Sequence, residues 1–196
     1  MSDYDYESYF SNPKKLDYWN RKKVLDKKYL APFVNSEKYT LNAGSGLFVE
    51  KDILKIKNIV CADISETAVK KLSSSGIKAV KVDLKNNWPF KNQEFEQILL
   101  LDVFEHLGQV DFFLKELFRV SKKNGAVVLG IPLLNHWRNY LKLIFMGTNG
   151  VQYDEHPRMF FDKDIKQLFS NAGFVIEKTK YIGVTKGYGY YLFKKK

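Results

Sequence analysis

The sequence predicts an α/β fold in which a mostly parallel sheet ends in an antiparallel pair of strands. Short apolar runs rich in β-forming residues alternate with helical stretches from residue 39 to residue 131, an order typical of βαβ units. Near the end of the chain, β-rich segments at 174–184 and 188–194 are joined only by residues 185–187. A connection this short forms a hairpin, which adds antiparallel strands to the sheet.

Hydrophobic periodicity and capping residues predict the individual elements. Ser65, Asp111 and Asp162 each stand at the start of a periodic stretch and are expected to begin helices, and 171–173 is expected to end the last helix. Strands are expected at 39–43, 58–63, 77–82, 96–101 and 125–131, and helices at 20–31, 48–56, 65–74, 110–122 and 162–172, with Phe112, Leu114 and Leu117 facing the sheet.

Composition indicates one domain spanning residues 1–196. The chain is 45% hydrophobic and has no stretch rich in proline, glycine and serine that would act as a linker. Within it we expect an N-terminal helical region at 1–36 and an insertion at 133–160. No apolar run approaches the roughly 18 residues that cross a bilayer, so a cytoplasmic protein is expected, with Cys61 as a small buried thiol.

The strongly positive charge raises the question of an acidic partner. The formal net charge is +10, which suits nucleic acid, an anionic lipid or a phosphorylated substrate. Only four of the 32 basic residues are arginines, whereas proteins that bind bases and phosphates favour the forked guanidinium group. Because the lysines are scattered singly or in pairs, the pattern also fits an ordinary solvated basic surface.

The segment YTLNAGSGLF, residues 39–48, predicts a strand that runs into a glycine turn, which can bring the backbone close to a cofactor. The fingerprint of dinucleotide-binding proteins is incomplete, because Val49 stands where that fingerprint has its third glycine. Asp63 and Asp83 follow the next two strands, and Leu101 ends the one after. Ligands of open α/β sheets bind at the carboxyl ends of the strands, so we expect these residues to border one crevice.

The side chains expected at this crevice suit an adenosine. The Asp63 carboxylate is placed to accept both ribose hydroxyls, and the Asp83 carboxylate to accept from an exocyclic amine while Leu84 packs against the base. Each residue also has a plain structural interpretation: Gly44 and Gly46 can end a strand, and the two aspartates can cap helices. Their occurrence together, in order and at strand ends, favours the binding interpretation.

With these motifs in place, the chain resembles the class I S-adenosylmethionine-dependent methyltransferases over about residues 39–194, in particular the type 11 and 23 members of glycan and small-molecule biosynthesis. The similar segments are LNAGSG, CADIS, VDLKNNWPF, the stretch from LLLDVFEHL to VVLGIP, and EHPRMFFDKDIKQLFSNAGF. The resemblance implies a Rossmann-like three-layer sandwich with a seven-stranded, mostly parallel sheet of order 3-2-1-4-5-7-6, in which strand 7 is antiparallel. It also implies S-adenosyl-L-methionine as the cofactor, bound by Asn42, Ala43, Gly44, Ser45, Gly46, Asp63, Ile64, Asp83, Leu84 and Leu101.

Two positions depart from the pattern of that family. Asn42 stands where an acidic residue is usual, so it keeps a hydrogen-bonding group but loses the charge that favours an ammonium group. Phe48 stands where a third glycine is usual, which leaves less room for close approach of the backbone, and the helix that follows is expected to be short. These changes favour weaker cofactor binding.

Methyl transfer from a sulfonium is a direct displacement that needs no nucleophile from the protein, so the useful search is for a base. His106, just after the fourth strand, and His156 are the candidate catalytic residues. His136 is expected near the acceptor pocket, and Arg158 is placed to hold an anionic acceptor group. His106 also has a structural interpretation, and His136 and His156 can be plain loop residues.

Two further features leave alternatives open. Asp102, Glu105 and His106 resemble an acidic–histidine pattern of some quinone-precursor O-methyltransferases, where a divalent ion assists, but they equally fit a helix start, and we assign no metal. Within 133–160, the segment 137–146 carries an apolar stripe beside basic residues. Such a stripe suits a lid over an apolar acceptor, contact with an anionic membrane surface, or a helix packed on the core.

The resulting hypothesis is a methyltransferase that acts on a small-molecule or glycan acceptor, at oxygen. An RNA methyltransferase would use the same cofactor together with the basic surface. A non-catalytic methyltransferase-like binding module would explain Asn42 and Phe48. The sequence sets neither the acceptor nor the oligomeric state.

Overall fold

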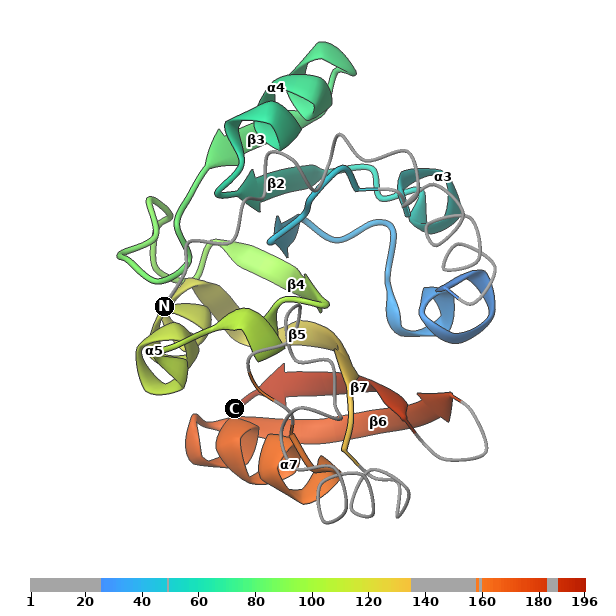
Figure 1. Ribbon diagram of the computed structural model, residues 1–196, viewed down its shortest axis with the longest axis vertical. Coiled ribbons are helices and arrows are strands. Elements are labelled where there is room, and N and C mark those ends of the chain that lie inside the picture. The colour runs from blue at the N-terminus through green and yellow to red at the C-terminus, as the bar shows by residue number, and fades with distance from the viewer. Residues whose placement is uncertain (1–25, 49, 135–157, 159, 183–186) are drawn as a thin grey trace, which may run out of the picture.

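The computed structural model contains one seven-stranded sheet of order β3-β2-β1-β4-β5-β7-β6, as predicted (Figure 1). Neighbouring strands from β3 across to β5 pair in parallel, whereas β7 is antiparallel to both β5 and β6. The structure describes residues 26–48, 50–134, 158, 160–182 and 187–196. The strands are β1 (Thr40–Ala43), β2 (Ile59–Asp63), β3 (Lys78–Lys81), β4 (Phe95–Leu101), β5 (Ser121–Pro132), β6 (Phe174–Ile182) and β7 (Tyr188–Lys195).

The helices fall where periodicity predicts them, with one shortened. The helix expected at 48–56 is reduced to a single turn, because Phe48 and Lys55 adopt left-handed backbone angles, with φ of 45° and 46°, on either side of it. Of the helix expected at 20–31, residues 26–31 are described, and residues 26–29 among them are α-helical. The elements are α3 (Lys51–Leu54), α4 (Glu66–Ser74), α5 (Val110–Val120) and α7 (Asp162–Asn171), with short 3₁₀ turns η1 (Ala31–Phe33) and η2 (Phe104–His106).

The predicted helix starts are confirmed for α4 and α7 and are one residue late for α5, but of the three predicted residues only Ser65 acts as a cap. The Ser65 hydroxyl accepts a hydrogen bond from the Ala68 amide at 3.2 Å and caps α4, as predicted. Asp111 and Asp162 lie inside the first turns of α5 and α7 and cap neither helix. In a first turn a carboxylate still stabilises a helix, through the positive end of the helix dipole.

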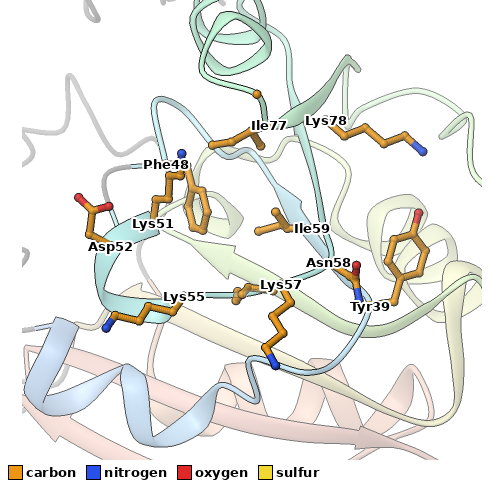
Figure 2. A pocket seen from close by; sticks show the side chains of 12 residues that line it. Tyr39, Phe48, Lys51, Asp52, Lys55, Lys57, Asn58, Ile59, Ile77 and Lys78 are labelled. Carbon is orange, nitrogen blue, oxygen red and sulfur yellow. The ribbon is translucent and has the colours of Figure 1, made fainter.

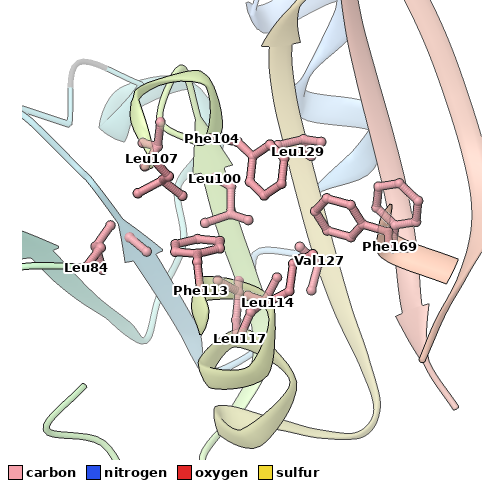
Figure 3. Packing of buried hydrophobic residues seen from close by; sticks show 14 of the residues in the cluster. Leu84, Leu100, Phe104, Leu107, Phe113, Leu114, Leu117, Val127, Leu129 and Phe169 are labelled. Atoms are coloured by element: carbon pink, nitrogen blue, oxygen red, sulfur yellow. The ribbon is translucent and has the colours of Figure 1, made fainter. Parts of the chain in front are cut away.

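Alternating strand residues divide the core between the two faces of the sheet. Ile98 and Leu100 of β4 belong to the cluster that α5 and α7 cover, whereas Leu99 belongs to the cluster under α3, α4 and residues 30–33. Figure 3 shows the first of these clusters, in which Phe113 of α5 points into the core. The prediction of Phe112 for this position was wrong, because α5 begins at Val110 and turns Phe112 to a half-buried position.

Several expectations fall on residues outside the described ranges. The segment 137–146, His136, His156 and most of the N-terminal region 1–36 lie there. The two ends of the expected insertion at 133–160 do lie side by side, because Leu133 and Phe160 form a bridge and the Leu134 amide donates to the Phe160 carbonyl at 2.9 Å. Among the described helices, none has the length and apolar character needed to cross a membrane.

Candidate functional site

The glycine turn after β1 requires glycine for two reasons. Gly44 and Gly46 have φ of 71° and 49°, in the left-handed region that other residues rarely adopt. A Cβ atom on Gly44 would also lie 2.4 Å from Cγ2 of Val103, just after β4. The backbone of the turn is therefore pressed against the end of the neighbouring strand.

The Asp63 carboxylate at the end of β2 faces the glycine turn. Its Oδ2 accepts a hydrogen bond from the Gly46 amide at 2.7 Å, and its Oδ1 accepts one from the Ser65 amide at 2.9 Å. The residue is only 6% exposed, so its orientation is fixed. A carboxylate is a strong acceptor for the hydroxyl groups of a ligand, and this one has a fixed position at the turn.

Residues that follow β2 and β3 lie at the same carboxyl ends of the sheet as Asp63. Ile64 is 38% exposed although it lies between buried neighbours, and it offers an apolar surface next to Asp63. The Val82 amide donates to the Asp63 carbonyl at 2.9 Å, which brings the half-buried Asp83 to this edge. Leu84, in contrast, is 8% exposed and packs in the core, so its side chain offers little surface to a base.

The edge continues at the end of β4, where the structure shows a contact that sequence analysis missed. Asp102 follows the half-buried Leu101 and adopts a left-handed φ of 55°. Tyr188, at the start of β7, donates a hydrogen bond from its hydroxyl to Asp102 Oδ1 at 2.7 Å. Burial and, after it, the Asp102 charge raise the pKa of Tyr188 well above its ordinary value. No local signal pairs these two residues, because 86 positions separate them.

The other candidates for catalysis lie just beyond Asp102. His106 is half-buried at the end of η2, and Glu105 beside it is fully buried. Arg158 donates to the Gly108 carbonyl at 2.6 Å, which holds its guanidinium group beside this segment. Across the described ranges, no group of three or more His, Cys, Asp or Glu side chains is placed to hold a metal ion.

A cleft with a volume of about 730 Å³ lies elsewhere on the molecule (Figure 2). It opens at the amino ends of the strands, where Tyr39 precedes β1 and Ile59 and Lys78 begin β2 and β3. The amino ends of the strands lie opposite to their carboxyl ends, where Asp63 lies. The cleft is therefore separate from the crevice that the sequence predicts, although it has four lysines in its lining, Lys51, Lys55, Lys57 and Lys78.

The two positions that depart from the family pattern are both buried. Asn42 is 2% exposed within β1. Phe48 is 4% exposed and packs in the core beneath α3, yet it keeps the left-handed φ that a glycine would adopt without strain. The turn therefore holds a phenylalanine in a backbone conformation that favours glycine.

A sheet of this order, with a glycine turn after β1 and carboxylates after β2 and β3 at one edge, is the class I methyltransferase fold. Residues 41–129 match the family model described as a methyltransferase domain. The matched residues carry the glycine turn, Asp63 and Asp83, and S-adenosylmethionine is the cofactor that this methyltransferase domain implies.

Comparison with individual proteins agrees with this assignment. The ubiquinone biosynthesis O-methyltransferase of Pelagibacter ubique is 27% identical over 149 residues, which are 72% of this chain and 60% of that relative. A SAM-dependent methyltransferase from Thermotoga maritima superimposes with a TM-score of 0.74 at 17% identity, covering 97% of this chain and 99% of that one. The methyltransferase in complex with the Trm112 methyltransferase activator of Haloferax volcanii has a TM-score of 0.78 at 12% identity, covering 99% of both chains. At such identities the solved structures show a shared fold.

The described residues fit the nucleoside half of this cofactor. Asp63 is held at the glycine turn by the Gly46 and Ser65 amides, and the exposed Ile64 lies next to it. Asp83 accepts from the Lys85 amide and the Asn86 side chain, each at 2.9 Å, and is only half-buried. Carboxylates beside an exposed aliphatic side chain suit a ribose and the flat face of a base.

Proposed function

We propose that this protein transfers the methyl group of S-adenosylmethionine to a small-molecule or glycan acceptor, at an oxygen atom, in the cytoplasm. The observation that carries the proposal is the Asp63 carboxylate, which accepts the Gly46 amide at 2.7 Å and is thereby held against the glycine turn. The choice of oxygen is supported by the O-methyltransferase relative, of which this chain spans 60%.

The protein's main task in this reaction is alignment. The bound cofactor supplies a methyl group that is activated by its sulfonium. Asp63 would hold the ribose hydroxyls and Asp83 the amine of the base, so that the methyl group is presented at a fixed point of the crevice. Correct orientation of reacting groups is worth about 7–11 kcal/mol of the barrier in favourable cases.

Transfer to oxygen also requires that the acceptor hydroxyl lose its proton. His106 remains our candidate for the base, because it lies in η2 directly after the β4 end of the crevice. A positioned base typically contributes about 10²–10⁴-fold to the rate. Arg158, held at Gly108, suits an anionic group on the acceptor, and His156 stays a second candidate outside the described residues.

An RNA acceptor is the less favoured alternative. The lysine-lined cleft lies at the amino ends of the strands, so a polyanion bound there would be on the far side of the sheet from Asp63. The carboxyl ends of the strands instead carry the carboxylates of Asp63, Asp83 and Asp102, which would repel a polyanion. We therefore propose that the basic surface mainly maintains solubility.

Calorimetry with S-adenosylmethionine and S-adenosylhomocysteine tests the proposal. We expect both ligands to bind, and Asp63→Ala to weaken binding by about 1–3 kcal/mol, because a hydrogen-bonded carboxylate is lost. Asp52→Ala, at an exposed position on α3, is the matched control and should bind as the wild type does. Failure of the folded wild-type protein to bind either ligand would refute the proposal.

The acceptor class needs a separate experiment. The protein is incubated with cofactor that carries a labelled methyl group and with fractionated cell extract. We expect the label to enter the small-molecule or glycan fraction. Label in RNA would support the alternative acceptor, and no transfer to any fraction, despite cofactor binding, would support a non-catalytic binding module.

A further inference from the structure

Asp102 lies directly beside the glycine turn. In the parallel pairing of β1 with β4, Asn42 is opposite Leu99, so the turn and Asp102 follow at the same level of the sheet. The next residue, Val103, packs against Gly44 so closely that a Cβ atom there would lie 2.4 Å from its Cγ2. A ligand that contacts the backbone of the turn therefore comes close to Asp102.

The strand order determines which half of the ligand is near Asp102. Asp63 and Asp83 follow β2 and β3, which lie on one side of β1, whereas β4 lies on the other side. If the nucleoside lies over β2 and β3, the rest of the cofactor passes the glycine turn towards the end of β4. Asp102 is then positioned for the amino-acid end of the cofactor, the half that Asp63 and Asp83 do not serve.

The Asp102 side chain has a fixed orientation. Its backbone amide donates to the Gly130 carbonyl at 3.0 Å, and Tyr188 donates from its hydroxyl to Oδ1 at 2.7 Å. The Tyr188 side chain can lie there because position 130 has no side chain: a Cβ atom at Gly130 would be 2.8 Å from the Tyr188 hydroxyl oxygen. A left-handed φ of 55° and a long-range hydrogen bond thus hold one carboxylate at the crevice edge.

Charge explains what this carboxylate is suited to bind. The amino-acid end of S-adenosylmethionine carries two cationic groups, the sulfonium and the α-ammonium. Asn42, at the end of β1, is uncharged and buried. Of the two described acidic residues between β4 and α5 next to this edge, Glu105 is fully buried, whereas Asp102 is half-buried and able to contact a ligand.

We propose that the Asp102 carboxylate, oriented by Tyr188, binds the cationic end of the cofactor. This inference rests on the proposed function and extends it to the second half of the same site. Asp102 is a binding residue in this scheme, and Tyr188 is a positioning residue that acts through it.

Three ligands and three variants test the proposal by calorimetry. The ligands are S-adenosylmethionine, S-adenosylhomocysteine, which lacks the sulfonium charge, and 5′-methylthioadenosine, which lacks the amino-acid end. Asp102→Asn removes the charge but keeps a residue that tolerates the left-handed backbone, and Tyr188→Phe removes only the orienting hydroxyl. Asp52→Asn makes the same chemical change at an exposed position on α3 and is the matched control.

We expect Asp102→Asn to weaken S-adenosylmethionine binding about tenfold, Tyr188→Phe about threefold, and neither to change 5′-methylthioadenosine binding. An equal loss for S-adenosylhomocysteine would place the carboxylate at the ammonium, and a loss confined to S-adenosylmethionine would place it at the sulfonium. Both results support the proposal.

Unchanged binding of S-adenosylmethionine and S-adenosylhomocysteine to Asp102→Asn would overturn the inference and leave the proposed function intact. Equal weakening of all three ligands would also overturn it, because the effect would then be general to the fold. If wild-type protein binds none of the ligands, the proposed function fails and the inference fails with it. Should Asp102→Asn not fold by circular dichroism, Tyr188→Phe decides: selective weakening supports the proposal, and unchanged binding overturns it.

Discussion

Phe48 is the residue at which local conformation and burial conflict. Its φ of 45° suits glycine, and a residue with a side chain pays about 1–2 kcal/mol to adopt this region. Its ring is nevertheless 4% exposed in the core beneath α3, together with Leu54. The packing of the ring therefore outweighs the backbone strain.

This conflict predicts an unusual order of stability. Phe48→Ala should cost about 3 kcal/mol, because it loses the burial and keeps the strain, whereas Phe48→Gly should cost about 1 kcal/mol less. Leu72→Ala and Leu72→Gly are the matched control inside α4, where glycine should be worse than alanine by about 1 kcal/mol. Urea unfolding measures all four, and a Phe48→Gly variant less stable than Phe48→Ala would contradict the prediction.

Cys61 is expected to be chemically inert in the folded protein. Burial raises the pKa of its thiol to about 12. A thiol reagent at pH 8 should therefore leave native protein unmodified and react with one thiol after denaturation. Rapid labelling of the native protein, measured by mass spectrometry, would show that this strand is open to solvent.

At the scale of elements, Asp162 joins helix α7 to the terminal hairpin. Its Oδ1 accepts hydrogen bonds from Tyr181 of β6 at 2.7 Å and Tyr191 of β7 at 2.8 Å, and Lys166 lies 2.7 Å from its Oδ2. Burial would raise the pKa of Asp162, but the hydrogen bonds from Lys166, Tyr181 and Tyr191 outweigh burial and lower that pKa.

Asp162→Asn should therefore cost about 1–3 kcal/mol of stability at pH 7. A carboxylate whose pKa is lower in the folded state stabilises the fold above its unfolded pKa of about 4 and loses this effect as pH falls through the folded value. The difference between wild type and variant should accordingly shrink below about pH 4. Asp111→Asn, in the first turn of α5, is the control and should cost no more than about 1 kcal/mol by chemical unfolding. A difference that grows in acid would contradict the assignment.

The β-hairpin and the helix caps show what local pattern can predict about elements. Residues 185–187 leave room only for a tight connection, so the antiparallel pairing of β6 with β7 was predictable. The roles of Asp111 and Asp162 were not, because a cap differs from a first-turn residue by one position. An error of one position also explains why Phe112 was predicted to face the core, where the structure places Phe113.

For the whole molecule, the net charge of +10 predicts weak, unspecific attraction to nucleic acid. A labelled RNA oligonucleotide should bind at low salt and lose at least tenfold in affinity between 50 and 200 mM salt, because released counterions drive the association. Asp63→Ala should leave this binding unchanged, since the lysine-lined cleft lies at the opposite edge of the sheet. Anisotropy that reveals tight, salt-independent binding would instead favour an RNA acceptor.

Local patterns in the chain predicted most of the strands and the terminal hairpin, and the family resemblance implied the order of the strands, which the structure confirms. Hydrophobic periodicity, and turn and strand-end residues such as Gly44, Gly46, Asp63 and Asp83, depend only on neighbouring positions in the sequence. Parallel strands then bring their carboxyl ends to one side of the sheet. The contact of Tyr188 with Asp102 and the cleft beside the shortened α3 depend on which distant elements pack together. This contact and this cleft also depend on backbone angles such as that of Phe48. That angle is set by the balance between burial of the side chain and backbone strain, to which the whole core contributes.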